Sequence, residues 1–199
     1  MKRKMKVLLG VLILGILIEI YSFVDLKHPI YNVNIATEEY ILCEENVSKE
    51  VITQSFIAET DTMKAMNIKC SVADESLNAE LKYALCDENG NELIQNNIKV
   101  NELKSGKFND FSFDTIKECK GNKYVFKIWT EENIETGVIL YKTASRQENT
   151  LLECNQTQEE GTLVLRVVEH KFDIETFIVV FCFVIYICFF IKMLYKFFR

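Results

Sequence analysis

The sequence predicts a mainly β protein: a single antiparallel β-sandwich, jelly-roll-like, flanked by two transmembrane α-helices. Three observations lead to this prediction. Apolar runs lie near both ends of the 199-residue chain, and short segments of alternating apolar and polar residues fill the middle. Helical periodicity is hard to find between the two apolar runs, which favours an antiparallel sandwich over βαβ units.

The N-terminal apolar run covers residues 7–24 and follows a basic tail, residues 1–6, with four positive charges. At about 1.5 Å per residue these 18 residues span roughly 27 Å, close to the hydrocarbon thickness of a bilayer. A cleaved signal peptide has a similar pattern, but "IEIYSFVDL" offers no small-x-small cleavage site. We therefore predict an uncleaved signal-anchor helix.

Glu19 is the one acidic residue within this first apolar run. An intramembrane carboxyl group is a candidate contact for a partner helix in a membrane protein complex. The alternative is that the membrane boundary lies near Glu19 and its carboxylate reaches the outer headgroups. Both interpretations are open at the level of sequence.

The C-terminal apolar run predicts a second transmembrane helix over residues 174–194. Residues 176–191 carry no charge, and the long side chain of Lys192 can reach the headgroups. A basic tail, residues 195–199, follows. The positive-inside rule then places both termini in the cytoplasm and the segment between the spans outside, at the plasma membrane.

Charge is divided sharply along the chain. The two ends hold seven of the 23 basic residues and none of the 29 acidic ones, so the remainder has a formal charge of −13. An acidic exterior argues against nucleic acid or anionic lipid as a ligand. The lipid bilayer itself is the partner that the two apolar runs require.

The central segment, residues 35–170, predicts one extracytoplasmic β-sandwich, because it is long enough for one core and contains no linker. Asn89-Gly90 is a favoured pair for a tight hairpin turn. The expected strands, read from alternation and turn signals, lie within residues 39–43, 51–58, 65–72, 77–85, 92–100, 108–113, 123–129, 136–142 and 162–168.

Five of the seven cysteines lie in this central segment, an odd number that leaves at least one thiol unpaired. Cys70 alternates with Met66 and Ile68 and is expected to face inward. Two interpretations stay open: a disulfide framework, or reduced cysteines that pack as small apolar side chains.

No catalytic, nucleotide-binding or metal-binding motif is present, so we expect neither an enzyme nor a cofactor. His28 and His170 each lie just outside an apolar run; they are either a metal pair or ordinary juxtamembrane residues. Two sequons, at Asn46 and Asn155, are possible glycosylation sites in a eukaryotic secretory pathway.

The segment "GNKYVFKIWT", residues 121–130, carries the candidate ligand site. Tyr124, Phe126 and Ile128 fall on one face of a strand and Lys127 and Trp129 on the other. An outward Trp129 could stack on a sugar ring while Lys127 binds hydroxyl groups. The alternative is that Trp129, the only tryptophan, packs beneath a loop or into the core.

Five segments occur in a characteristic order: "ITQSF", "MKAMNIKC", "LNAELKYALCDENG", "FNDFSFDTIKECKGNKYVFKI" and "TGVILYK". This order, over residues 51–142, resembles the extracytoplasmic β-sandwich module of Gram-positive cell-surface polysaccharide-assembly and glycosyltransferase-like membrane proteins. The resemblance implies a carbohydrate-associated accessory domain. It implies no transferase activity, because only two spans flank the module, and it carries over no functional residue.

Together these observations predict a membrane-anchored, non-catalytic sandwich that binds cell-envelope polysaccharide or an assembly partner. Two other hypotheses remain: a structural or scaffolding subunit of a larger membrane complex, and a glycosylated host-interaction surface protein.

Overall fold

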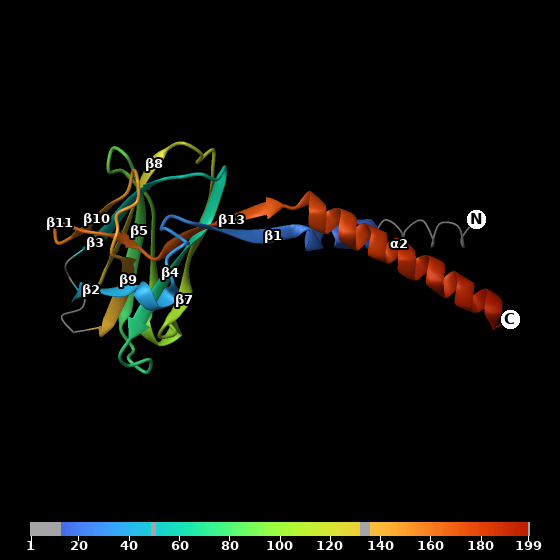
Figure 1. Ribbon diagram of the computed structural model, residues 1–199, viewed down its shortest axis with the longest axis horizontal. Helices are drawn as coiled ribbons and strands as arrows, with labels where there is room; N and C mark the ends of the chain where they lie inside the picture. Colours follow the sequence, from blue (N-terminus) through green and yellow to red (C-terminus); the bar gives the residue numbers. More distant parts are fainter. Residues whose placement is uncertain (1–12, 49–50, 132–135, 199) are drawn as a thin grey trace. The chain divides into compact units, whose positions relative to one another are not determined.

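The computed structural model describes residues 13–48, 51–131 and 136–198. Within these residues the chain forms two antiparallel β-sheets (Figure 1). The prediction of a mainly β, antiparallel fold is therefore confirmed. The chain divides into two units, which are described separately: Leu26–Glu169, which holds the sandwich, and Met1–Asp25 with His170–Arg199.

In the described residues, the first sheet, sheet A, has seven strands in the order β1-β13-β4-β9-β12, with β2 also paired to β9 and β7 to β4. The strands of sheet A are β1 (Phe23–Pro29), β2 (Ile41–Asn46), β4 (Thr62–Val72), β7 (Lys107–Lys117), β9 (Val138–Thr143), β12 (Thr162–Leu163) and β13 (Leu165–Phe172).

The second sheet, sheet B, has six strands in the order β11-β10-β3-β8-β5-β6. Its strands are β3 (Ile52–Ile57), β5 (Glu80–Asp87), β6 (Glu92–Lys99), β8 (Lys123–Trp129), β10 (Leu151–Cys154) and β11 (Thr157–Glu159). Two short 3-10 helices, η1 (Thr37–Glu39) and η2 (Val100–Glu102), complete the sandwich. The predicted strands at 51–58, 65–72 and 123–129 coincide closely with β3, β4 and β8.

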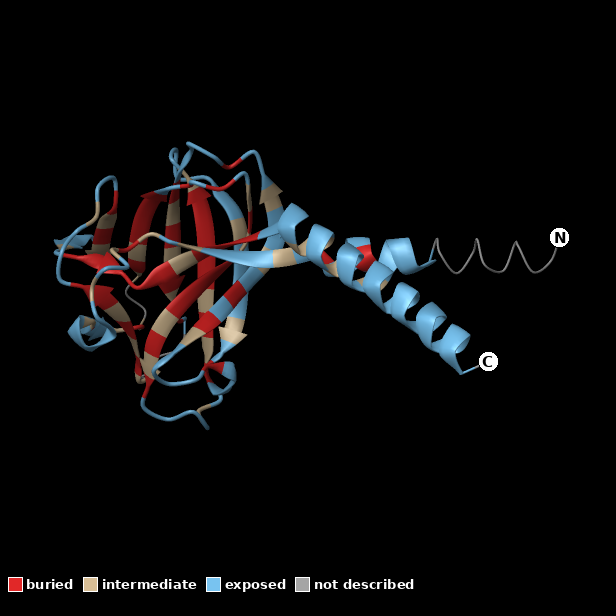
Figure 2. Cartoon of the chain, turned by 45° about the vertical axis from the view of Figure 1, so that its right-hand side comes forward, coloured by how far each residue is buried: buried red, intermediate tan, exposed pale blue. Residues whose placement is uncertain are grey.

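The core lies between the two sheets, where their inward faces meet (Figure 2). Phe111 of sheet A packs edge-on against Tyr83 and Phe126 of sheet B, with ring centroids 5.2 and 6.1 Å apart. Edge-to-face pairs of this kind contribute about 0.5–1.5 kcal/mol beyond the area they bury. Contacts between aromatic rings of the two sheets show that the sheets pack face to face as a sandwich.

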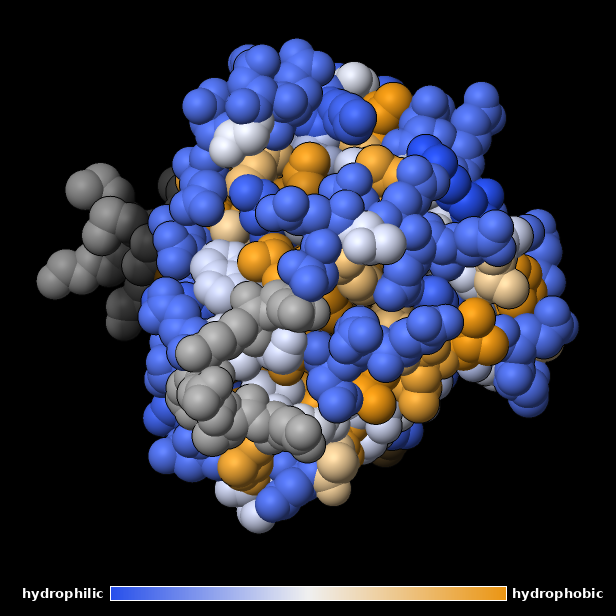
Figure 3. Space-filling view, turned by 90° about the vertical axis from the view of Figure 1, so that its left-hand side faces the viewer, coloured by the Kyte–Doolittle hydropathy of each residue, from blue (hydrophilic) through white to orange (hydrophobic). Residues whose placement is uncertain are grey.

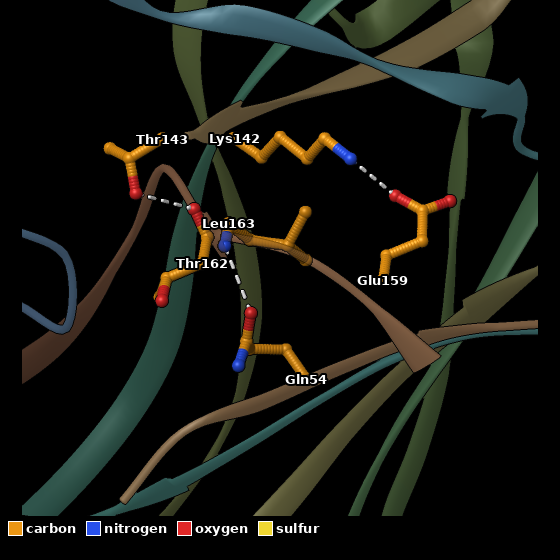
Figure 4. A network of polar contacts seen from close by, with 6 residues as sticks. All are labelled: Gln54, Lys142, Thr143, Glu159, Thr162 and Leu163. Atoms are coloured by element: carbon orange, nitrogen blue, oxygen red, sulfur yellow. Dashed lines mark hydrogen bonds and ion pairs between the residues drawn. The ribbon is translucent and has the colours of Figure 1, made fainter. Parts of the chain in front are cut away.

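A buried glutamine links the two sheets at one edge of this core. The Gln54 side chain of β3 accepts a hydrogen bond from the main-chain N–H of Leu163 in β12, at 2.9 Å. Its amide nitrogen donates to the carbonyl oxygens of Ser55 and Leu151, at 3.0 and 3.1 Å. Since Gln54 is fully buried, these bonds satisfy a side chain that would otherwise be costly to bury (Figure 4).

The hairpin predicted at Asn89-Gly90 is present between β5 and β6, but it is not a two-residue turn. The Gly90 N–H donates to the Asp87 carbonyl oxygen, and Gly90 has a φ of 84°. The Asp87 carboxylate accepts main-chain bonds from Asn89 and Asn91. This is a turn followed by a left-handed glycine and a shift in strand register, a common alternative in longer hairpin loops.

Three strands, β1, β10 and β11, were not among those predicted, and the segment 162–168 divides into two strands. The break falls at Val164, whose N–H donates to the Tyr141 carbonyl oxygen while its own carbonyl accepts from Lys69. Gly161 has a φ of 106°, and a Cβ there would lie 2.1 Å from the Thr143 carbonyl oxygen. The main chain at Gly161 therefore packs directly against the main chain at Thr143, and this contact requires a glycine just before β12.

The second unit contains the apolar ends of the chain. Helix α2 (Ile174–Phe197) has 24 residues, about 36 Å at 1.5 Å per residue, and extends three residues beyond the predicted second span. Asp173 caps it by accepting a hydrogen bond from the N–H of Thr176. Among the described residues α2 is the one helix long and apolar enough to cross a membrane.

Residues 13–21 of the predicted first span are helical, and residues 7–12 lie outside the described residues. The predicted helix included Phe23 and Val24, but in the structure these residues begin β1. Ser22 ends the helix: its hydroxyl and its N–H both donate to the Ile18 carbonyl oxygen. The apolar run is thus shared between a helix and a strand, which hydropathy alone does not separate.

Candidate functional site

Trp129 and Lys127 lie on the outer face of sheet B. Along β8, Tyr124, Phe126 and Ile128 are buried in the core, whereas Lys127 and Trp129 are half-buried on the opposite face. Strand β8 is an interior strand, between β3 and β5. The two side chains therefore stand on a sheet surface rather than at its edge.

The neighbours of these two residues are set by strand register. Lys82 of β5 lies opposite Trp129, and Thr53 of β3 and Ala84 of β5 flank Lys127. We name this surface, defined by Trp129, Lys127, Lys82, Thr53 and Ala84, the β8 platform. Ala84 is completely buried, so a small side chain in the middle of the platform is covered by longer ones around it.

The charges on the β8 platform are only partly compensated. Lys82 forms an ion pair with Glu131, at 2.6 Å from nitrogen to oxygen. The Asn97 side chain, opposite Lys82 on β6, donates to the Glu80 carboxylate at 3.0 Å. In the part of the chain that the structure describes, Lys127 has no ion pair. An aromatic ring beside an unpaired ammonium and bonded polar groups is a surface that can stack on a sugar and bind its hydroxyls.

Glu19 is exposed in the helical residues 13–21. Its carbonyl oxygen accepts a hydrogen bond from the N–H of Ser22, at 3.1 Å, so it lies in the last turn of this helix. This position is compatible with either of the two interpretations of its carboxylate.

The two histidines face separate carboxylates. His28 Nε2 lies 3.4 Å from the buried Glu169, and His170 Nδ1 lies 2.7 Å from Asp25. No group of three or more potential metal-binding side chains occurs among the described residues. Each histidine therefore lies within ion-pair distance of a carboxylate of its own, but only the His170–Asp25 contact is a hydrogen bond. The sequence did not indicate either carboxylate.

The two sequons differ in accessibility. Asn155 is exposed at the turn between β10 and β11, where Asn155 and Gln156 both have positive φ, 51° and 62°. Asn46, at the end of β2, is half-buried and is followed by the fully buried Val47. Asn155 is thus the sequon that presents its side chain to solvent.

A buried cluster of charged groups and thiols was missed by sequence reasoning. Lys142 of β9 forms an ion pair with Glu159 of β11, at 2.7 Å, and both side chains are at least 85 % buried (Figure 4). Burial alone would raise the pKa of Glu159, but the hydrogen bond and charge of Lys142 lower it, with help from the Cys154 thiol. Alternation placed Lys142 in a strand, but no sequence signal identified its partner.

The cluster borders a surface hollow of about 620 Å³, lined by four glutamates, among them Glu44 and Glu160. Figure 3 views the molecule from the side on which β2, β10 and β11 lie in Figure 1; hydrophilic residues predominate there, and hydrophobic ones lie between them in small groups. The Lys142–Glu159 pair is satisfied internally, and it holds β9 and β11 together.

Cations and aromatic rings alternate on the outer face of sheet A. Arg166 lies 3.6 Å from the centroid of the Phe108 ring and donates two hydrogen bonds to the Tyr31 hydroxyl. Lys69 lies 5.1 Å from the ring centroids of both Tyr40 and Tyr141. Tyr31 and Tyr40 come from the segment between β1 and β2, so these contacts tie that segment to the sheet.

No protein-family model matches this chain, and no curated protein matches it either. The resemblance to the polysaccharide-assembly module therefore stays a prediction.

Proposed function

We propose that this protein is a non-catalytic binding module, anchored in the membrane, whose sandwich binds a cell-envelope polysaccharide through the β8 platform. The observation that carries the proposal is the outward position of Trp129 beside Lys127 on an interior strand. A half-buried aromatic ring on a sheet surface offers a flat apolar face on which a ligand can stack. The polar groups beside it favour a hydroxyl-rich ligand.

The proposed membrane arrangement has two spans. Helix α2 supplies one, and the N-terminal apolar run that contains residues 13–21 supplies the other. Basic residues at both ends of the chain and the acidic character of the segment between them support cytoplasmic termini and an extracytoplasmic sandwich. A jelly-roll-like sandwich agrees with a carbohydrate ligand, since many lectin domains have that architecture, although fold alone does not determine function.

The test is cosedimentation of the full-length chain, in phosphatidylcholine nanodiscs, with purified cell-wall polysaccharide from the source organism. Trp129→Leu removes the aromatic face and should weaken retention by about tenfold, equivalent to about 1.4 kcal/mol. Trp129→Phe keeps a ring and should retain most of the binding. Lys127→Gln should weaken it less than Trp129→Leu.

Glu19→Leu is the matched control for this experiment, because it alters the apolar helical segment and leaves the sandwich unchanged. Polysaccharide retention should stay at the wild-type level in this variant. Equal retention by wild type and Trp129→Leu would contradict the proposal. Loss of a co-purifying membrane protein in Glu19→Leu, with no polysaccharide retained by wild type, would instead identify a scaffolding subunit.

A further inference from the structure

A second cavity lies at the other end of sheet B from Trp129. It has a volume of about 350 Å³, at the lower end of the range for small-ligand sites. Four parts of the sandwich line it: the end of β1, the end of β3 with the loop that follows, the loop between β9 and β10, and Val167 of β13. Ile57 pairs with Lys123, at the start of β8, whereas Trp129 is the last residue of that strand.

Two polar atoms at this cavity are buried without a hydrogen-bond partner. The hydroxyl of Thr60, a residue only 3 % exposed, is one, and Nε2 of His28 is the other. His28 Nε2 is 3.4 Å from Glu169, which is itself buried. Buried polar side-chain atoms nearly always make a hydrogen bond, so two atoms without one, on residues that line the same cavity, point to a ligand with hydrogen-bonding groups.

The loop between β9 and β10 is fixed in place around this cavity. The Thr150 hydroxyl donates to the Gln147 carbonyl oxygen at 2.9 Å, and the Gln147 N–H donates to the Thr162 hydroxyl at 2.9 Å. Thr143 donates to the carbonyl oxygens of Ser145 and Thr162. These bonds hold the cavity walls before any ligand arrives, which reduces the entropy lost on binding.

The lining determines the charge of the ligand. Glu59 and Glu148 are exposed at the cavity, and neither has an ion pair within the described residues. Among the described residues that line the cavity there is no lysine or arginine. Two unpaired carboxylates repel an anionic ligand and attract an ammonium group, while the buried side chain of Phe56 supplies an apolar wall.

We infer that this cavity binds a single amino-sugar unit, with its ammonium group at Glu59 and Glu148 and its hydroxyls paired with Thr60 and His28. The site is independent of the β8 platform. A sandwich with both would contact a polysaccharide at two places, a long surface on sheet B and a pocket for one cationic sugar.

The test is a titration of the full-length chain, in phosphatidylcholine nanodiscs, with glucosamine, glucose and glucuronic acid. Saturation-transfer NMR detects the binding of each sugar. Glucosamine should bind, glucose should bind more weakly, and glucuronic acid should not bind. Thr60→Val keeps the side-chain shape but removes one hydrogen bond and should weaken glucosamine binding by about two- to tenfold. Glu148→Gln, at an exposed position where folding is not at risk, should reduce the preference for glucosamine over glucose.

Two controls separate this inference from the proposed function. Thr53→Val removes a hydroxyl from the β8 platform and should leave glucosamine binding unchanged, as should Trp129→Leu. If the cavity holds only water, no saturation will be transferred from the protein to glucosamine, and that result would overturn the inference. Equal binding of glucosamine and glucuronic acid, or wild-type affinity in both Thr60→Val and Glu148→Gln, would overturn it as well.

Discussion

At the residue scale, the Lys142–Glu159 pair shows how a buried charge constrains the sequence. Removing one partner leaves the other charge buried and alone, which is far more costly than losing an exposed ion pair. The two residues sit on β9 and β11, far enough apart in sequence that no local pattern connects them. Such a pair is visible only once the sheets are assembled.

We predict that Lys142→Met destabilises the sandwich by about 3 kcal/mol, because Glu159 then lacks its partner. Lys142→Met combined with Glu159→Leu should recover most of this loss, since neither charge remains. Urea unfolding of the full-length chain in detergent micelles, followed by the fluorescence of Trp129, measures both. An additive loss in the double variant would contradict this account of the pair.

The same pair predicts a pH dependence. The pKa of Glu159 is lower in the folded chain than its ordinary value of about 4.5. Its contribution to stability is therefore fully present above pH 4.5 and is lost as the pH falls through the lower, folded pKa. The urea concentration at which half of the chain is unfolded, measured between pH 3 and 7, should decrease toward the acid end of this range. The decrease should be smaller in Glu159→Gln, because the glutamine side chain does not titrate.

The cysteines give a third prediction at this scale. The described residues include all seven cysteines, each of which is a free thiol, and the five in the sandwich are buried. Burial, together with the smaller effect of the Glu159 charge, raises the pKa of Cys43 to about 12. At pH 8 the folded chain should resist alkylation by iodoacetamide at these five positions, whereas urea-unfolded chain should react at all of them. Peptide mass spectrometry distinguishes this outcome from a disulfide framework, in which paired residues would stay unmodified even in urea.

At the element scale, what the sequence could predict depended on alternation. Strand β8 alternates regularly between buried and less buried residues, strand β4 does so at both of its ends, and the sequence predicts both strands. Strand β10 has only four residues and β11 only three, too few for a pattern to be distinct, and their turn at Asn155-Gln156 lacks glycine. Strand β1 could not be recognised from the sequence, because it begins within the N-terminal apolar run.

Of the two candidate sites, one could be predicted from alternation in the sequence and the other could not. Alternation along β8 was enough to place Trp129 and Lys127 on one face, because a strand repeats every two residues. The cavity beside Thr60 is made by four parts of the chain that are distant in sequence. Residues of this kind are brought together by sheet assembly, and no spacing in the sequence connects Thr60 with Gln147 or His28.

Replacement by alanine should reduce the stability of the sandwich by different amounts at two of its glycines. Gly90 and Gly161 both have positive φ, 84° and 106°, but only Gly90 has open space where a Cβ would lie. Gly90→Ala should therefore cost about 1 kcal/mol, the strain of the backbone alone. Gly161→Ala adds a clash with the Thr143 carbonyl oxygen and should destabilise the sandwich several times more. Urea midpoints measured side by side test this, and equal losses would contradict the contact at Thr143.

At the scale of the whole molecule, the distribution of apolar surface separates the two units. In the sandwich the large apolar side chains fill the space between the sheets (Figure 2). Helix α2 has no buried residue, and aromatic and branched side chains cover its surface. Such a helix is stable only in lipid or against a partner, because water would face an apolar surface all round it.

This distribution predicts the topology of the full-length chain. Single cysteines introduced at the exposed Asn89 and Asn155, with the two native thiols of α2 replaced by serine, should react with a membrane-impermeant maleimide in intact cells. A cysteine placed after Arg199 should react only after the cells are permeabilised, since basic ends stay in the cytoplasm. Labelling of the C-terminal cysteine in intact cells would contradict the proposed orientation. Extraction of the chain by carbonate without detergent would contradict the span itself, because α2 would then be held by protein contacts rather than by lipid.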